Sequence, residues 1–433
     1  MYTSIIQAAT LPISLQEFKL RASAWADRFP LVACYDSHQI PYPHNSFDNL
    51  LAVSSGSIIE LDEAHAFGSL RRELKNSRRL LCGCLTYDLK NQTEQLQSMH
   101  PDFVGFPAIF FFEPEVYVYF NDDNISINSS EDNVEFILAS ILATHVPAPA
   151  SPLGLEVKQR VSPEAYKANV ERIRNYILEG EVYELNYCME FFAEQVQLDP
   201  LGLYLALSAA SPTPFGGYLK YRDKYLLCAS PERFLKKEGR KLISQPIKGT
   251  IRRGTTSAED EALRQQLRND EKELAENMMI VDLVRNDLRR SCATGSVQVE
   301  EMFGIYAFRQ VHQMISTISG ELRPECDLVD ALLGAFPMGS MTGAPKIRAM
   351  QLIEATEETK RGLYSGSFGY IRPDGDCDFN VVIRSLQYNA ATGYLSFMVG
   401  SAITYDSVPE KEYEECLLKA QAMLKVLGSV GQY

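Results

Sequence analysis

The chain has 433 residues, of which 45% are hydrophobic and 23% are charged. This composition is typical of a globular protein with two or three domains, and it excludes a collagen-like, coiled-coil or disordered chain. With 42 basic and 56 acidic residues the net charge is −14. A chain this acidic repels a phosphate backbone, so we expect no nucleic-acid partner.

Apolar stretches and cysteines indicate the cellular environment. No apolar stretch approaches the ~18–20 residues that a membrane helix needs, so we expect no membrane segment. No basic flank precedes the first short apolar run, which argues against a signal peptide. Nine scattered cysteines favour free thiols in a reducing cytoplasm. Cys82 and Cys84 lack a second pair at zinc-site spacing, so we interpret them as strand residues.

The first clear elements precede a proline-rich segment. Glu115–Phe120 alternates apolar and polar residues, and Ile125–Asn128 follows a polar NDDN turn. This pattern predicts a β-hairpin. The segment His145–Gly154 contains three prolines and several small residues, which predicts a linker. It divides the chain into an N-terminal region, 1–150, and a larger region, 156–433.

After the linker, helical and strand patterns form separate clusters. Tyr218–Tyr221 and Tyr225–Ala229 predict a second hairpin, and helical periodicity covers Pro163–Glu179, Ala258–Arg290 and Val408–Gly428. Because strands and helices do not alternate strictly, we expect an α+β protein with antiparallel sheets rather than a doubly wound parallel sheet. No phosphate-binding or dinucleotide-binding glycine pattern occurs.

Two of the predicted helices carry glutamates three residues apart. Glu273 and Glu276 lie in the second pattern, and Glu412 and Glu415 lie in the third, which Ser407 is expected to cap. Residues at this spacing share a helical face. If the two faces converge, they form an oxygen-rich site suited to Mg²⁺. On spacing alone, two solvated acidic faces are the more common arrangement.

A lysine in Pro246-Ile-Lys-Gly-Thr250 is a candidate nucleophile. Burial in a dry pocket lowers the pKa of an amine, and a neutral Lys248 could attack an electrophile. Glu232, if it lies nearby and ionised, would oppose that shift. The alternative is a surface lysine in a loop.

Small residues and a lone arginine are typical of an anion site. Gly339–Lys346, GSMTGAPK, lets a backbone approach a ligand closely, and the helix expected over Pro345–Ala355 would direct its amides at an anion. A tight strand-to-helix turn is the alternative. Tyr364, Arg384 and Gly400 fall on three successive strand-like segments. Arg384 stands in an apolar stretch and needs either a structural carboxylate or an anionic ligand.

Five ordered motifs resemble the chorismate-utilising enzymes, which include the anthranilate, aminodeoxychorismate, isochorismate and salicylate synthases. They are SPE at Ser230–Glu232, AENMMIVDLVRND, GSMTGAPK, the GxYSGxxGY stretch at Gly362–Tyr370, and EYEECLLKA. The resemblance covers about Val161–Leu427. Gly83–Asp88 looks more loosely like the N-terminal region of anthranilate synthase component I. The family implies a large antiparallel β-sandwich with helices packed outside.

Within the family, PIKGT is similar to the aminodeoxychorismate synthases, component I, whereas anthranilate synthases have alanine in place of Lys248. This resemblance implies amination of chorismate by ammonia to 4-amino-4-deoxychorismate, for 4-aminobenzoate and folate synthesis. Lys248 would attack C2, Glu232 would protonate the departing C4 hydroxyl, and His312 would orient the substrate. Anthranilate synthase component I and a non-catalytic regulatory or partner-binding subunit remain the alternatives.

The resemblance also implies a metal site and a substrate site. Glu276 and Glu415 would bind Mg²⁺ directly, and Glu273 and Glu412 would bind it through water, so that the metal holds the ring carboxylate of chorismate. The implied substrate-binding residues, mostly around the enolpyruvyl carboxylate, are Ser340, Thr342, Gly343, Tyr364, Arg384, Gly400 and Lys419.

Three positions depart from the family pattern. Glu184 stands where relatives usually have glutamine, or lysine in the water-adding enzymes, so lysine-assisted water addition is not expected. Arg289 replaces a usual glycine and is expected to alter packing. Leu50–Val53, LLAV, replaces a Leu-Leu-Glu-Ser that helps relatives bind tryptophan, so no tryptophan site is carried over.

The source of ammonia is the last inference from the resemblance. The sequence has no Gly-x-Cys-x-Gly nucleophile elbow. Ammonia would therefore come from solution or from a separate glutamine amidotransferase subunit, component II, as in the family.

Overall fold

Two antiparallel sheets organise the chain in a computed structural model that describes residues 1–62, 65–76, 78–94, 96–146, 150, 152–309 and 311–429. The first sheet has 12 strands and the second has 10. Both sheets take strands from each side of the predicted linker. Residues 147–149 and 151 of that linker lie outside the described residues, so the linker and the boundaries of the two regions stay predictions.

The first sheet begins at the N-terminal strand and ends within the GSMTGAPK motif. In spatial order it contains β1 (Tyr2–Gln7), β8 (Asn124–Ser129), β7 (Val116–Phe120), β3 (Leu50–Ser54), β2 (Leu31–Asp36), β11 (Phe215–Tyr221), β12 (Lys224–Ser230), β21 (Ser385–Asn389), β22 (Tyr394–Ile403), β10 (Glu184–Ala193) and β18 (Gly343–Ala344), with β9 (Lys158–Gln159) also paired to β10.

The second sheet brings the PIKGT segment to its edge. Its order is β15 (Ile247–Arg252), β17 (Val311–Glu321), β14 (Lys241–Gln245), β13 (Arg233–Glu238), β20 (Cys377–Asn380), β19 (Ser367–Ile371), β5 (Leu81–Leu85), β6 (Ile109–Phe112) and β4 (Ile58–Leu61), with β16 (Gln298–Ala307) also paired to β17.

The sheets pack face to face, and the central strands are buried on both sides. On β3, Leu50 and Ala52 enter the core between the sheets, while Leu51 and Val53 face the helices that cover the first sheet. The rings of Tyr35 on β2 and Phe368 on β19 stack across the sheets with centroids 4.4 Å apart. A strand that is buried on both faces needs a nearly continuous apolar run. The apolar sequence LLAV at Leu50–Val53 meets that requirement.

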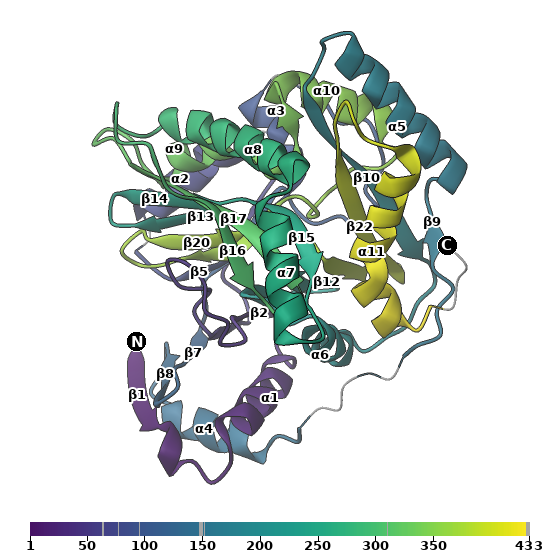
Figure 1. Ribbon diagram of the computed structural model, residues 1–433. Helices are drawn as coiled ribbons and strands as arrows, with labels where there is room; N and C mark the ends of the chain where they lie inside the picture. Colours follow the sequence, from purple (N-terminus) through teal and green to yellow (C-terminus); the bar gives the residue numbers. More distant parts are fainter. Residues whose placement is uncertain are drawn as a thin grey trace.

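Helices cover the outer faces of both sheets (Figure 1). The first sheet packs against α1 (Leu15–Ala26), α4 (Val134–Ala143), α5 (Pro163–Leu178), α6 (Pro200–Ala210), α10 (Lys346–Thr356) and α11 (Pro409–Leu427). The second packs against α2 (Ala66–Asn76), α8 (Glu271–Arg289) and α9 (Leu328–Ala335), while α7 (Ser257–Arg268) contacts β15 and the short α3 (Lys90–Thr93) follows β5. The predicted α+β sandwich with outer helices is confirmed.

The hairpins and helix ends follow most of the local sequence patterns. Both hairpins are confirmed, as β7–β8 and β11–β12. The helical pattern expected over Ala258–Arg290 is occupied by two helices, α7 and α8. Asp270 has extended backbone and accepts a hydrogen bond from the Glu273 amide, so it caps α8. Ser407 does not cap α11; its hydroxyl accepts a hydrogen bond from the Thr404 amide instead.

Three further expectations concern side chains away from the site. Arg289 is exposed on the last turn of α8, so it does not alter core packing as expected. Cys82 and Cys84 are buried strand residues on β5, and all nine cysteines are free. Over the described ranges, no helix is both long enough and apolar enough to cross a membrane.

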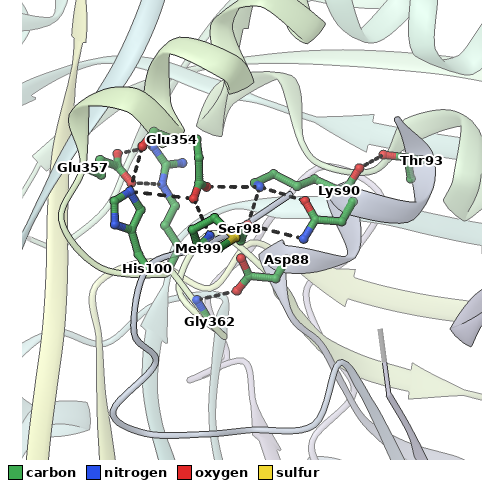
Figure 2. Close-up of polar contacts among 11 residues, drawn as sticks. Asp88, Lys90, Thr93, Ser98, Met99, His100, Glu354, Glu357 and Gly362 are labelled. Atoms are coloured by element: carbon green, nitrogen blue, oxygen red, sulfur yellow. Dashed lines mark hydrogen bonds and ion pairs between the residues drawn. The ribbon is translucent and has the colours of Figure 1, made fainter. Parts of the chain in front are cut away.

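Polar contacts of Asp88 and Lys90 join the N-terminal region to Glu354 and Gly362 of the larger region (Figure 2). The buried Lys90 ammonium donates to the Ser98 hydroxyl at 2.6 Å and lies 3.5 Å from a carboxylate oxygen of Glu354 on α10. Asp88 accepts a hydrogen bond from the Gly362 amide at 3.1 Å. These contacts hold α10 and the turn that leads to Tyr364 in place.

Candidate active site

Lys248 lies on β15 and is mostly buried, not exposed in a loop. Its Nζ is 2.7 Å from Oε1 of Glu184, at the start of β10; the two side chains are 11% and 2% exposed. Burial alone would lower the pKa of Lys248, but the negative charges of Glu184 and Glu276 outweigh it and raise the pKa above its ordinary value. The structure therefore holds Lys248 as an ammonium, whereas the sequence led us to expect a lowered pKa.

Glu232 occupies the turn between β12 and β13 and is also buried. Its Oε1 accepts a hydrogen bond of 2.6 Å from the hydroxyl of Ser340, which lies in η3 (Gly339–Met341), a short 3₁₀ helix. Burial raises the pKa of Glu232 to about 7, although the Ser340 hydroxyl and the charge of Lys248 act against the rise. A carboxyl group that is part protonated near neutral pH suits a general acid.

The acidic faces of α8 and α11 converge. The ammonium of Lys272 lies 3.6 Å from a carboxylate oxygen of Glu276 on α8 and 3.7 Å from one of Glu412 on α11. Both glutamates are buried, which excludes two separate solvated faces. Burial raises the pKa of Glu276 to about 7, and the nearby Lys248 charge limits that rise.

These carboxylates fit an open site for a hard cation. Oε1 of Glu276 and Oε2 of Glu412 are buried and accept no hydrogen bond within the described part of the chain. No group of three His, Cys, Asp or Glu side chains there is arranged to enclose a metal ion. Mg²⁺ commonly takes one or two carboxylates and completes its shell with water and substrate oxygens. Two buried carboxylate oxygens that accept no hydrogen bond, one of them 3.6 Å from the Lys272 ammonium, are compatible with it.

Arg384 has no carboxylate partner in an ion pair among the residues that the structure describes. It immediately precedes β21 with a positive φ of 53°, is half-buried, and forms no ion pair with any residue that the structure describes. Burial lowers the pKa of its guanidinium, while Tyr364 and Glu415 act to raise it. Of the two partners left open by the sequence, the structure favours an anionic ligand.

The three segments expected to be strands are placed differently. Gly400 lies on β22, but Tyr364 lies in the turn before β19 and Arg384 just outside β21. Tyr364 is buried, with its hydroxyl 3.8 Å from the sulfur of Cys188 on β10. The expectation of three successive strands is therefore wrong for two of the residues, because tight turns before the strands carry them.

Two glycines permit close backbone approach. A Cβ on Gly343 would lie 2.1 Å from the carbonyl oxygen of Glu184, and Gly343 has a φ of 155°. A Cβ on Gly400 would lie 2.5 Å from the Cys188 sulfur. Both positions exclude larger residues, and Gly343 packs the GSMTGAPK turn directly onto the strand that carries Glu184.

Two other expected substrate-binding side chains have protein partners. The Thr342 hydroxyl donates to the Met338 carbonyl at 3.2 Å, within its own turn. Lys419 donates to the Gly400 carbonyl at 2.8 Å and pairs with Glu415 at 2.6 Å. In this arrangement both side chains shape the site, and their contact with a substrate stays a prediction.

His312 belongs to a neighbouring cluster. It lies on β17, and its Nε2 is 2.9 Å from Asp260, which also receives a bidentate contact from Arg253. Its Nδ1 is buried without a hydrogen-bond partner among the residues described. No contact joins it to Lys248 or Glu232 there, so its role toward a substrate stays a prediction.

Some residues of the site were not singled out by the sequence. Lys346 pairs with Asp287 at 2.6 Å and so joins the GSMTGAPK and VRND motifs. Arg361 pairs with Glu357 and donates to the Met341 carbonyl at 2.6 Å, fixing the Ser340 turn from behind. These residues stand within or beside the motifs, but nothing in their spacing identifies their partners.

Comparisons with known proteins identify the family of the chain. The model of a family described as chorismate binding enzyme matches residues 39–425. Anthranilate synthase component 1 of Thermus thermophilus is 37% identical over 356 residues, covering 80% of this chain and 76% of that protein. Aminodeoxychorismate synthase component 1 of Bacillus subtilis is 36% identical over 364 residues, with the same coverage of 80% and 76%.

A solved structure is similar along nearly the whole chain. Anthranilate synthase component I from Streptococcus pneumoniae superposes with a TM-score of 0.77 at 28% identity, covering 90% of this chain and 94% of that one. The two sequence relatives carry different names at nearly equal identity. Overall similarity therefore does not select between their reactions, and the choice depends on individual residues.

Proposed function

Because the chain belongs to the chorismate-binding enzyme family, we propose that it aminates chorismate with ammonia to 4-amino-4-deoxychorismate. This is the reaction of an aminodeoxychorismate synthase component I, in 4-aminobenzoate and folate synthesis. The observation that carries the proposal is the buried Lys248 of PIKGT, in contact with Glu184. Alanine in its place would leave no nucleophile on this strand.

The proposed reaction has two displacements. In the first, Lys248 forms a bond to C2 of chorismate, the two conjugated ring double bonds shift toward C4, and the C4–O bond breaks, while Glu232 gives the leaving oxygen a proton so that water departs. In the second, ammonia bonds to C4, the double bonds shift back and the lysine leaves C2; the proton that the added nitrogen loses restores the Glu232 acid. A covalent intermediate divides one difficult displacement into two easier ones, and the raised pKa of Glu232 supplies a proton at neutral pH.

Two parts of the site are proposed to bind the two carboxylates of chorismate. Mg²⁺ held by Glu276 and Glu415, with Glu273 and Glu412 through water, would neutralise and position the ring carboxylate. Arg384, which forms no ion pair with a carboxylate of the described residues, would hold the enolpyruvyl carboxylate beside Tyr364, Gly400 and the Ser340–Gly343 turn. His312 would orient the substrate.

Ammonia is proposed to come from solution or from a separate glutamine amidotransferase subunit. The sequence offers no nucleophile-elbow cysteine for glutamine hydrolysis. The free thiols are consistent with work in the cytoplasm.

Anthranilate synthase component I is the second candidate, favoured by the 37% identity to the Thermus protein. Product identity separates the two. The purified chain, incubated with chorismate, Mg²⁺ and an ammonium salt, should give 4-amino-4-deoxychorismate by mass spectrometry. Fluorescent anthranilate as the main product would reject the proposal in favour of the second candidate.

A further inference from the structure

Glu184 is placed rigidly against the proposed nucleophile. It begins β10, where Glu184 pairs with Ala344 of β18, and the Gly343 backbone packs against its carbonyl. Its side chain is almost completely buried, and one carboxylate oxygen is 2.7 Å from Lys248 Nζ. The other oxygen, Oε2, is buried and accepts no hydrogen bond from the residues that the structure describes.

Lys248 is surrounded by acidic groups, but only one of them contacts it. Negative charge reaches its ammonium from Glu184 on β10, Glu276 on α8 and Glu415 on α11. It also lies within electrostatic range of Glu232 and of Glu273. Lys272 and Lys419 offset the charges on the helices, since they pair with Glu276, Glu412 and Glu415. Among the described residues, Glu184 alone accepts a hydrogen bond from Lys248, and it pairs with no other cation there.

This geometry presents a chemical difficulty for the proposed reaction. An ammonium has no lone pair and cannot attack C2, so Lys248 must lose a proton before the first displacement. Bulk solvent is a poor acceptor for a group buried in an ion pair. A carboxylate already hydrogen-bonded to the ammonium is within the distance at which direct proton transfer occurs.

We propose, on the basis of the proposed function, that Glu184 is the proton acceptor that converts the Lys248 ammonium into the attacking amine. One N–H bond of Lys248 breaks and its proton moves to Glu184, which becomes a neutral carboxylic acid. The freed electron pair forms the bond to C2, and the electrons of the C4–O bond leave with the oxygen, which Glu232 protonates. When ammonia later expels the lysine, the neutral amine recovers its proton from Glu184.

A bound substrate would favour this transfer. Two opposite charges in a water-excluded site cost desolvation energy, and a neutral amine beside a neutral carboxylic acid avoids that cost. A glutamine in place of Glu184 could accept a hydrogen bond from Lys248 but could not take its proton. Glu184 would therefore give this chain an internal base that an amide at the same position could not supply.

The test is the rate at which Lys248 becomes covalently modified. Wild type and Glu184→Gln are mixed with chorismate and Mg²⁺ without ammonium, quenched in acid and examined by intact-protein and peptide mass spectrometry. We expect an adduct of chorismate minus one water on Lys248, formed ~100-fold more slowly in the variant at pH 7. Because solvent must then take the proton, the ratio of variant to wild-type rates should rise about tenfold per pH unit.

Two further variants separate proton transfer from packing. Glu184→Asp keeps a carboxylate and should recover part of the rate, measured beside thermal unfolding of each variant. Glu190→Gln removes another buried carboxylate of β10, one bound to Arg160, Tyr394 and Ser396. It should form the adduct at the wild-type rate even if it unfolds at a lower temperature.

The outcomes distinguish this inference from the proposed function. Adduct formation in Glu184→Gln at or above the wild-type rate at pH 7 would overturn the inference and leave the covalent mechanism standing, because Glu184 would then only hold the lysine as an ammonium. A ratio of variant to wild-type adduct-formation rates that does not change with pH would overturn the inference as well. Product formation by wild type with no Lys248 adduct would reject the covalent mechanism, and the inference with it.

Discussion

The hydroxyl of Ser340 donates a hydrogen bond of 2.6 Å to Glu232, across 108 residues of sequence. This contact joins the turn that opens the GSMTGAPK motif to the carboxyl group of the SPE motif. It orients one oxygen of Glu232. The two motifs are therefore parts of one site, and the burial that raises the pKa of Glu232 to about 7 has consequences for both stability and activity.

Glu232→Gln should stabilise the fold at alkaline pH while it removes activity. A carboxyl pKa raised from 4.5 to about 7 on folding means that the folded state binds the proton more tightly, so stability is lost as pH rises from about 4.5 through 7. At pH 8 the variant should gain on the order of 3 kcal/mol at most. Urea unfolding at pH 4 and pH 8 measures this, and the two proteins should differ little at pH 4.

The activity of that variant should fall ~100-fold or more, because an amide cannot protonate the leaving oxygen. Equal stability of the two proteins at pH 8 would contradict the raised pKa of Glu232. Full activity in the glutamine variant would contradict its role as the acid.

Glu276→Gln should weaken Mg²⁺ binding, because it replaces a buried carboxylate with an oxygen that accepts no hydrogen bond from the described residues. We expect the Mg²⁺ concentration for half-maximal activity to rise ~10-fold or more. Mg²⁺ should also raise the unfolding temperature of wild type and do so less for the variant. Glu271→Gln is the matched control, since Glu271 is exposed on the same helix. An unchanged requirement in Glu276→Gln would argue against this metal site.

Arg384→Met should lower affinity for chorismate without lowering stability. The guanidinium is half-buried and has no ion-pair partner among the described residues, so its removal leaves no carboxylate uncompensated. The KM for chorismate should rise ~10-fold or more, equivalent to about 1.4 kcal/mol of binding. Steady-state kinetics and thermal unfolding check the two parts. Marked destabilisation with an unchanged KM would show that Arg384 is structural.

Local sequence patterns predicted much of the framework and fewer of the contacts. Alternation around NDDN predicted the β7–β8 hairpin, because side-chain direction in a strand depends only on neighbours in sequence. The three-residue spacing of Glu273 and Glu276 predicted their common helical face, but not the face of α11 that they meet. The contact between the two acidic faces depends on how α8 packs on the second sheet and α11 on the first.

The pair at the centre of the site was beyond sequence reasoning. Glu184 was recognisable as a departure from the family, but it lies 64 residues from Lys248 and on a strand of the other sheet. The expected lowering of the Lys248 pKa considered burial without this partner, and the partner reverses the sign of the shift. Pairing across sheets is a property of the topology, which the motifs do not encode.

The ammonia source gives a simple solution prediction. The purified chain should turn over chorismate with ammonium salts and fail with glutamine, because its sequence has no nucleophile-elbow cysteine. The rate with ammonium should rise with pH as more of the ammonium becomes ammonia. Glutamine-dependent turnover by the chain alone, free of any amidotransferase, would contradict this.

The most direct test of the account compares the products of wild type and Lys248→Ala. Both are incubated with chorismate, Mg²⁺ and concentrated ammonium at alkaline pH, and the products are identified by mass. The account predicts that 4-amino-4-deoxychorismate falls ~100-fold or more, about 2.7 kcal/mol of barrier, while chorismate still binds through Arg384 and the metal. Slow anthranilate formation should appear, since ammonia can reach the vacated C2 position. Formation of 4-amino-4-deoxychorismate at the wild-type rate would contradict the central role of Lys248.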